Sequence, residues 1–167
     1  LGPGLARVAP DVPPERYAQL SARYRYHYVK HQDDISLFDG VPALLTQLRQ
    51  RGYKLAVATG KSRRGLDRAL ASRELASVFD SSRTADETAG KPNPLMLHEL
   101  MDEFGIPAER TLMVGDTSHD LQMAQNAGCA SVGVSYGAHD GDGLLAYGAL
   151  CVVHSVPELR QWLLAHA

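Results

Sequence analysis

What this sequence of 167 residues has little of excludes several classes of protein. Only two cysteines occur, Cys129 and Cys151, so we expect both thiols to be ordinary core residues in a reducing, cytoplasmic setting. No apolar stretch approaches the roughly 20 residues that a membrane-spanning helix needs. The 17 basic and 19 acidic residues give a net charge of -2, which leaves no large field of one sign to attract nucleic acid or a membrane surface. Affinity for an anion must therefore come from a local group of residues.

What the sequence does contain, from Leu37 onward, is a regular alternation of apolar runs and helical segments. Strands are predicted at residues 53–58, 77–80, 111–114, 130–134 and 150–153. Helices are predicted at residues 41–51, 65–76, 94–104, 120–126, 143–147 and from residue 157. Apolar strands that are each followed by a helix indicate a parallel sheet covered on both faces. We therefore expect a doubly wound, Rossmann-like α/β fold, whose ligands bind beyond the carboxyl ends of the strands.

The first 36 residues form a separate region. Asp11, followed by Pro13 and Pro14, predicts the start of a helix that continues to about Lys30. Tyrosines alternate with basic residues along this helix, a pattern that can bind single-stranded nucleic acid. A helix that packs its tyrosines against a neighbour and exposes a basic face explains the same pattern, and we favour this interpretation.

Polar residues follow three of the predicted strands in the second region. Thr59 and Gly60 open a helix, where exposed amides and a hydroxyl group favour an anion such as phosphate. Lys91 stands between a glycine and a proline, and a fixed ammonium group can neutralise phosphoryl oxygens. Asp116 and Asp120 supply hard oxygen ligands that suit Mg²⁺. Because parallel strands present their carboxyl ends at one edge, the sequence predicts a phosphate and metal site there.

Each of these residues also has a simpler interpretation. Thr59 is a common type of helix cap, and Lys91 fits an ordinary turn. Asp116 and Asp120 could cap the helix that they precede, since carboxylates stabilise helix starts by about 0.5 to 2 kcal/mol. Three independent strand ends that carry a hydroxyl, an ammonium and a carboxylate pair at one edge favour the functional interpretation.

A nucleotide-binding P-loop is the main rival, because a strand, Gly60-Lys61-Ser62 and a helix follow one another. The P-loop also needs a glycine five places before Gly60, so that the backbone can wrap the phosphates. That place holds Leu55, inside the predicted strand, and the P-loop interpretation therefore fails.

At these positions the sequence resembles a known family. Residues Val57-Ala-Thr59-Gly-Lys61, Gly90-Lys91-Pro92-Asn-Pro94 and Met113-Val-Gly-Asp116-Thr-Ser-His-Asp120 resemble, in order, the second, third and fourth motifs of the haloacid dehalogenase superfamily. Phe38-Asp-Gly40-Val41 and Ala85-Asp-Glu-Thr88 are similar to its phosphoglycolate phosphatase-like branch. Residues 37–167 resemble the α/β core of that branch, and residues 1–36 resemble the latter half of its helical cap.

The resemblance implies an Mg²⁺-dependent phosphatase that hydrolyses a small phosphorylated metabolite, such as phosphoglycolate, through an aspartyl phosphate. A phosphosugar mutase reaction stays open. By motif, Thr59 and the Gly60 amide would hold phosphate oxygens, and Lys91 would balance charge on the nucleophile and the phosphate. Asp116 would bind the metal, and Asp120 would hold a metal-bound water or orient Lys91. Such a division is physically sensible, because phosphoryl transfer depends mainly on positioning and electrostatic stabilisation.

The sequence departs from the family at the first motif, an apolar strand ending in D-x-D-G-T that supplies the nucleophile and the general acid. In the family this strand lies between the strands that end at Thr59 and near Asp116, so we expect a divided sheet. Because the first residue is Leu1, we also expect the sequence to begin inside a longer natural chain and to be inactive alone. The alternative is a non-hydrolytic homologue that binds phosphate or a partner.

Overall fold

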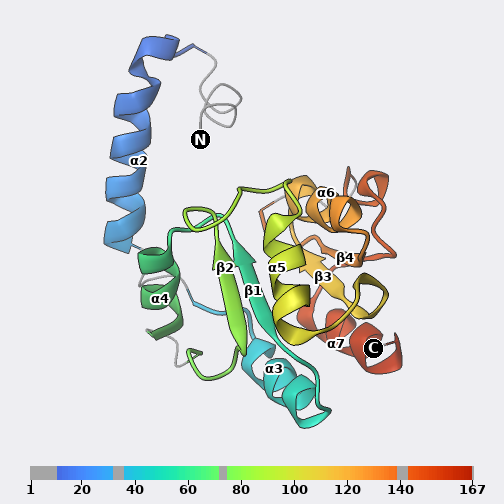
Figure 1. Cartoon of the computed structure of the whole chain (residues 1–167). Helices are drawn as coiled ribbons and strands as arrows, with labels where there is room; N and C mark the ends of the chain where they lie inside the picture. The colour runs from blue at the N-terminus through green and yellow to red at the C-terminus, as the bar shows by residue number, and fades with distance from the viewer. Residues whose placement is uncertain (1–10, 32–35, 72–74, 139–142, 167) are drawn as a thin grey trace. The chain divides into compact units, whose positions relative to one another are not determined.

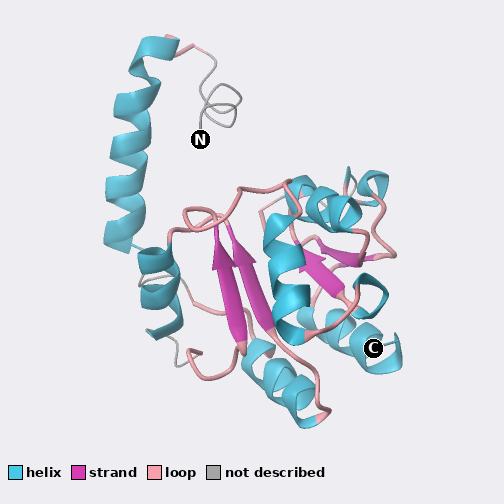
Figure 2. Ribbon diagram, in the orientation of Figure 1, coloured by secondary structure: helices cyan, strands magenta, loops and turns pink. Residues whose placement is uncertain are grey.

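A computed structural model of the protein describes residues 11–31, 36–71, 75–138 and 143–166. The chain divides into two compact units, Leu1–Ser36 and Leu37–Ala167. In the first unit, the 3-10 helix η1 (Pro14–Arg16) precedes helix α2 (Tyr17–His31), close to the bounds that the sequence predicts (Figure 2). The assignment of this unit to part of a helical cap stays a prediction, and its first ten residues lie outside the described part of the chain.

Helices alternate with short strands throughout the second unit (Figure 1). Its elements are α3 (Val41–Gln50), β1 (Ala56–Thr59), α4 (Arg63–Ala71), β2 (Ser81–Thr84), α5 (Leu95–Phe104), η3 (Ala108–Arg110), β3 (Leu112–Gly115), α6 (Ser118–Ala127), β4 (Ala130–Val134), η5 (Leu145–Tyr147), β5 (Val152–Val153) and α7 (Val156–His166). All the strand pairs are parallel. The predicted α/β fold with a parallel sheet is therefore confirmed.

The strands form two separate sheets. In the first, β1 pairs with β2, and Thr59 lies opposite Thr84. In the second, β4 lies between β3 and β5, and Gly115 of β3 lies opposite Gly133. Among the described residues no strand pairing joins β1 to β3, so the sheet is divided between these two strands.

Two apolar clusters hold the helices against the strands. In one, α3 and α7 pack with β4 and β5 around Leu44, Leu48, Val132, Val134, Val153, Val156, Leu159 and Leu163. In the other, α5 and α6 pack around Met96, Leu97, Met101, Met123, Ala124, Ala127 and Cys129. Ala58 of β1 and Met113 of β3 both pack against this second cluster. The second cluster therefore forms an apolar link between the two sheets.

Both cysteines are free thiols in this core. Cys129 is buried and Cys151 is half-buried, and burial raises the pKa of each thiol. The prediction that they are core residues is confirmed. None of the helices in the described ranges is both long and apolar enough to cross a membrane.

The strand predicted at residues 53–58 is β1 at Ala56–Thr59, and the helix predicted at 65–76 is α4 at Arg63–Ala71. Three other predicted elements differ more from the structure. The strand predicted at residues 77–80 is wrong, because the strand is β2, at Ser81–Thr84. Asp80 instead uses its carboxylate to accept a hydrogen bond from the backbone N–H of Leu55 at 2.9 Å. The helix predicted at 143–147 is the short 3-10 turn η5, and the strand predicted at 150–153 is confined to Val152–Val153.

Candidate functional site

The structure brings Lys91 and Asp120 together. The Lys91 ammonium group lies 2.5 Å from Oδ1 of Asp120. Only 18% of the Lys91 side chain and 6% of the Asp120 side chain are exposed, so the pair is largely removed from water. Lys91 follows β2 and Asp120 lies in the first turn of α6, after β3. The contact therefore connects the chain that leaves the first sheet with the helix that leaves the second.

Asp120 is held from its other side by the start of α6. Thr117 is the N-cap residue, and its hydroxyl oxygen accepts a hydrogen bond from the Asp120 backbone N–H at 3.3 Å. In return, Oδ2 of Asp120 accepts from the Thr117 backbone N–H at 3.0 Å and from its hydroxyl at 2.7 Å. This reciprocal arrangement is a capping box. The helix-capping interpretation therefore applies to Asp120, in addition to its contact with Lys91.

These contacts determine the charge state of Asp120. Burial acts to raise the pKa of this carboxyl group, but the positive charge of Lys91 and the hydrogen bonds from Lys91 and Thr117 outweigh it. The net effect is a pKa below the ordinary aspartate value. Asp120 is therefore an anion at neutral pH, with one oxygen directed to Lys91 and the other to Thr117.

Gly115 is required by the close approach of α6 to the end of β3. A Cβ atom at this position would lie 2.3 Å from Cβ of Asp120. No side chain fits there unless Asp120 moves, so the glycine that ends β3 allows Asp120 to occupy its place.

Asp116 is held by a different segment, the turn that follows β4. Its Oδ2 atom accepts a hydrogen bond from the backbone N–H of Ala138 at 2.7 Å. A Cβ atom on Gly137 would lie 2.3 Å from the same oxygen, so a glycine is needed for this approach. Among the described residues the other oxygen, Oδ1, has no hydrogen-bond partner.

Thr59 and Gly60 form the turn that joins β1 to α4. The Thr59 hydroxyl oxygen accepts a hydrogen bond from the backbone N–H of Lys61 at 3.2 Å. The carbonyl oxygen of Lys61 accepts from the backbone N–H of Ala85 at 3.3 Å. The turn is thus joined to the segment after β2 that continues to Lys91. Thr59 is half-buried and Gly60 is exposed, as a surface that receives a ligand requires.

The carboxylate that best fits a magnesium ion is Asp116. No group of three or more histidine, cysteine, aspartate or glutamate side chains that could enclose a metal occurs in the part of the chain that the structure describes. Mg²⁺ commonly uses only one or two protein carboxylates and keeps several waters, so Asp116, with one uncommitted oxygen, fits this ion. The oxygens of Asp120 already accept hydrogen bonds from Lys91 and Thr117.

A cavity of about 400 Å³ lies beside α4 and β2, with Arg63, Asp67, Phe79 and Ser82 among its lining residues. Its lining includes none of the five predicted site residues. The predicted site residues lie elsewhere, at or just after the ends of β1, β2 and β3.

The structural roles of several residues around the predicted site were not identified from the sequence. The Thr117-x-x-Asp120 spacing is a capping-box signal that could have revealed the role of Thr117. The roles of Gly137 and Ala138 involve backbone atoms, for which the sequence carries no distinct signal. One D-x-D spacing does occur, at Asp140-Gly-Asp142, but it follows β4 and lacks the threonine of D-x-D-G-T. Both aspartates lie outside the described residues.

Comparison with known proteins gives consistent matches. Residues 7–134 match the family described as haloacid dehalogenase-like hydrolase. The chain is 33% identical to the pyrophosphatase PpaX of Halalkalibacterium halodurans over 161 residues, which cover 95% of this chain and 75% of that protein. It is 36% identical to a phosphoglycolate phosphatase of Aliivibrio fischeri over 137 residues, which cover 81% of this chain and 60% of the relative.

Solved structures agree with these matches. The crystal structure of a "predicted phosphatase" from Clostridium acetobutylicum superimposes with a TM-score of 0.84 at 26% identity, over 99% of this chain and 77% of that one. A hydrolase from Deinococcus radiodurans superimposes with a TM-score of 0.79 at 23% identity, over 96% of this chain and 72% of that one. At 23% identity, the match to the Deinococcus radiodurans structure shows a similar fold only.

Proposed function

Since this chain belongs to the haloacid dehalogenase-like hydrolase family, we propose that it holds the phosphate and the metal ion of an Mg²⁺-dependent phosphatase that acts on small phosphate monoesters. The relatives named as phosphatases confirm the predicted class of enzyme. One of them is named a pyrophosphatase and the other a phosphoglycolate phosphatase, which supports a small phosphorylated metabolite as substrate.

The observation that carries the proposal is the largely buried contact between Lys91 and Asp120. An ammonium group in low-dielectric surroundings stabilises negative charge much more strongly than it does in water. Asp120 fixes the position of Lys91, and Thr117 fixes the position of Asp120. Lys91 is thereby prepared to neutralise charge that develops on phosphoryl oxygens, with no rearrangement needed during the reaction.

The remaining site residues are proposed to bind the phosphate and the metal ion. Thr59 and the backbone N–H of Gly60 bind phosphate oxygens at the start of α4, where helix amides favour an anion. Asp116 would hold Mg²⁺, with its carboxylate oriented by the N–H of Ala138. Such an ion would supply positive charge to polarise the phosphoryl group.

In the proposed reaction an aspartate carboxylate takes the phosphoryl group as the ester P–O bond breaks and the alcohol leaves, and water then hydrolyses the aspartyl phosphate to inorganic phosphate and free aspartate. The sheet is divided between β1 and β3, and Thr59 ends β1 while Asp116 directly follows β3. We place the nucleophile on an apolar strand with two aspartates between β1 and β3, because a parallel strand there would end at the same edge as Thr59 and Asp116.

The test is turnover of p-nitrophenyl phosphate by the natural full-length protein, with Mg²⁺ and after removal of metal by a chelator. We expect turnover with Mg²⁺, none after chelation, and recovery when Mg²⁺ is restored. Asp116→Asn is expected to lower the apparent affinity for Mg²⁺ by at least about 10-fold. Asp102→Asn, which removes a carboxylate from the exposed side of α5, is the matched control.

The outcomes of this test distinguish a metal-dependent phosphatase from a non-catalytic homologue. Turnover that survives chelation, or that Asp116→Asn leaves unchanged, would contradict the assignment of Asp116. A full-length protein that binds inorganic phosphate without turnover would replace the phosphatase with the non-catalytic, phosphate-binding homologue.

A further inference from the structure

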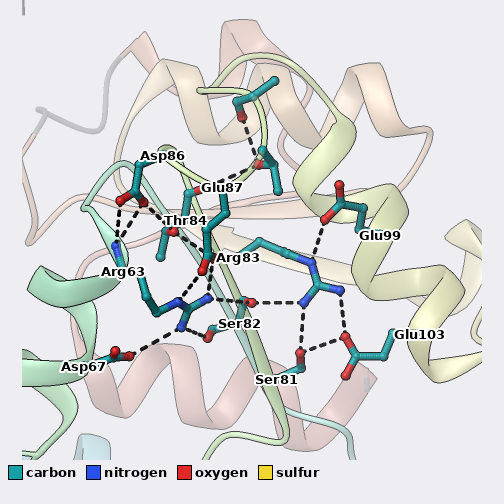
Figure 3. Close-up of polar contacts among 12 residues, drawn as sticks. Arg63, Asp67, Ser81, Ser82, Arg83, Thr84, Asp86, Glu87, Glu99 and Glu103 are labelled. Carbon is teal, nitrogen blue, oxygen red and sulfur yellow. Dashed lines mark hydrogen bonds and ion pairs between the residues drawn. The ribbon is translucent and has the colours of Figure 1, made fainter.

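Arg63, the first residue of α4, is tied through its backbone to the segment that follows β2 (Figure 3). Its backbone N–H lies 2.9 Å from Oδ1 and 3.2 Å from Oδ2 of Asp86. The first amides of a helix have no partner within the helix and favour negative charge. Asp86 therefore supplies the start of α4 with a carboxylate from the neighbouring strand's loop.

The Arg63 side chain makes a second connection to the same segment. Nε and Nη2 donate to the two carboxylate oxygens of Glu87, at 2.8 and 2.6 Å. Nη1 also donates to the Ser82 hydroxyl at 2.7 Å. A planar guanidinium group that meets a carboxylate at two points fixes orientation as well as distance. Arg63 thus holds α4 to β2 and to the loop after it.

Hydrogen bonds also shift the pKa values of Arg63 and Glu87. The hydrogen bond with Glu87 holds the pKa of Arg63 above its ordinary value. The hydrogen bonds from Arg63 and Thr84 lower the pKa of Glu87 to about 2. Both partners are therefore charged at every pH at which the protein is expected to work.

Thr84 places this network directly beside Thr59. Its side chain is fully buried, and its hydroxyl lies 2.7 Å from Oδ1 of Asp86 and 2.9 Å from Oε2 of Glu87. In the sheet, Thr84 is the register partner of Thr59. The backbone contact between Ala85 and Lys61 lies next to it. The turn after β1 and the loop after β2 are thus joined at the level of the phosphate-binding residues.

We propose that Arg63 is a positioning residue, which with Glu87 sets the separation between the Thr59–Gly60 turn and the segment that leads to Lys91. The inference rests on the proposed function, in which the turn and Lys91 hold the same phosphoryl group. Because 34% of the Arg63 side chain and 40% of the Glu87 side chain are exposed, the pair contributes little to stability. Its effect is on geometry, and small displacements of catalytic groups lower rates strongly.

Arg83, which lies in β2, provides a matched control for Arg63 of α4. Its Nε and Nη2 atoms pair with Glu99 at 2.6 Å and Glu103 at 2.8 Å, and 22% of its side chain is exposed. Both glutamates belong to α5, so Arg83 joins β2 to a helix and not to the turn after β1. Figure 3 shows the two arginines on opposite sides of β2. Both arginines donate to the Ser82 carbonyl oxygen, at 3.2 and 3.0 Å, but their carboxylate partners lie on different elements.

The test compares Arg63→Lys, Glu87→Gln, the double variant and Arg83→Lys in the natural full-length protein. The measurements are kcat and KM for p-nitrophenyl phosphate with saturating Mg²⁺, the inhibition constant of inorganic phosphate, and the urea midpoint of unfolding. We expect Arg63→Lys to lower kcat/KM by about 10- to 100-fold and to weaken inhibition by phosphate, because lysine cannot reproduce the two-point contact. Arg83→Lys should leave kcat/KM and the inhibition constant of phosphate unchanged. The urea midpoints of Arg63→Lys and Arg83→Lys should be similar, so a loss of stability would not explain the difference in activity.

Arg63 and Glu87 act as one unit in this proposal, so the double variant should be no worse than Arg63→Lys alone. Unchanged turnover in Arg63→Lys, or an equal loss in Arg83→Lys, would overturn the positioning role. Additive losses in the double variant would also overturn it. A wild-type protein that neither hydrolyses the ester nor binds phosphate would instead overturn the proposed function, and this role with it.

Discussion

The Lys91 ammonium group and the Asp120 carboxylate lie 2.5 Å apart, although one residue follows the first sheet and the other follows the second. A hydrogen bond from the Asn126 side chain to the Pro92 carbonyl oxygen, at 2.9 Å, makes a second connection between the same segments. The helices α5 and α6 also pack in one apolar cluster. Lys91 and Asp120 therefore have two roles: they form part of the proposed active site, and they link the two halves of the α/β unit.

Asp120→Asn is expected to destabilise the protein by about 2 to 3 kcal/mol, because it leaves the Lys91 charge without a partner in a mostly buried position. The expected value lies at or below the low end for fully buried pairs, since 18% of the Lys91 side chain is exposed. The measurement is the free energy of unfolding from urea titrations. Lys54→Met, which breaks the exposed pair with Asp80, is the control and should cost about 0.5 kcal/mol. Equal losses in the two variants would contradict the prediction.

Gly115→Ala is expected to destabilise the protein by about 1 to 3 kcal/mol, the usual cost of overpacking. The new Cβ atom would lie 2.3 Å from Cβ of Asp120, so the first turn of α6 must move. Gly143→Ala is the control, because its Cβ atom would meet no atom within 4 Å. Thermal unfolding of both variants measures the difference. A Gly115→Ala protein as stable as Gly143→Ala would show that α6 accommodates the methyl group at no cost.

Gly137→Ala is expected to weaken Mg²⁺ binding by about 10-fold, because a Cβ atom at this position would lie 2.3 Å from Oδ2 of Asp116. The carboxylate must then rotate away from the Ala138 N–H that orients it. Calorimetric titration of the full-length protein with Mg²⁺ in the presence of inorganic phosphate measures the affinity. Ala138→Gly keeps the N–H donor and should bind Mg²⁺ like the wild type. If both variants bind Mg²⁺ equally well, the turn after β4 does not position Asp116.

Glu87 is expected to make stability depend on pH in the acid range. Its pKa is lowered from 4.5 to about 2 in the folded protein, so between these values the unfolded chain binds the proton more readily. This stabilisation, which is small because 40% of the Glu87 side chain is exposed, is therefore present above about pH 4.5 and is lost as the pH falls toward 2. Urea unfolding at about pH 5 and about pH 3 should show a smaller fall in stability for Glu87→Gln than for the wild type. The exposed substitution Glu109→Gln is the control, and a fall of equal size in all three proteins would contradict the prediction.

Short-range sequence patterns identified most of the elements. The strand predicted at residues 130–134 is observed with the same bounds, because its apolar run stands between the glycine that ends α6 and a polar turn. Gly105 and Gly128 end their helices in the left-handed conformation, with φ of 62° and 74°. Such signals are local, so they can be interpreted without knowledge of the rest of the chain.

The second strand shows where local patterns fail. The sequence of β2, Ser-Ser-Arg-Thr, has no apolar alternation. The strand is therefore predicted at residues 77–80, which precede β2 and are more apolar. Arg83 of this strand is held by Glu99 and Glu103, which are contributed by α5. The strand is thus stabilised by contacts with a helix later in the chain. Propensity and periodicity carry no information on such contacts.

The sequence by itself determined the family, the α/β fold and which side chains follow the strand ends, because strands and helices that alternate along a chain place those ends at one edge of a parallel sheet. The catalytic and binding roles of Thr59, Gly60, Lys91, Asp116 and Asp120 stay predictions from their motifs. Only the tertiary structure decided which groups meet: Lys91 with Asp120, and Arg63 with Glu87. These partners stand 29 and 24 residues apart, and their contacts depend on how buried helix and strand faces pack together, which no local pattern of residues encodes.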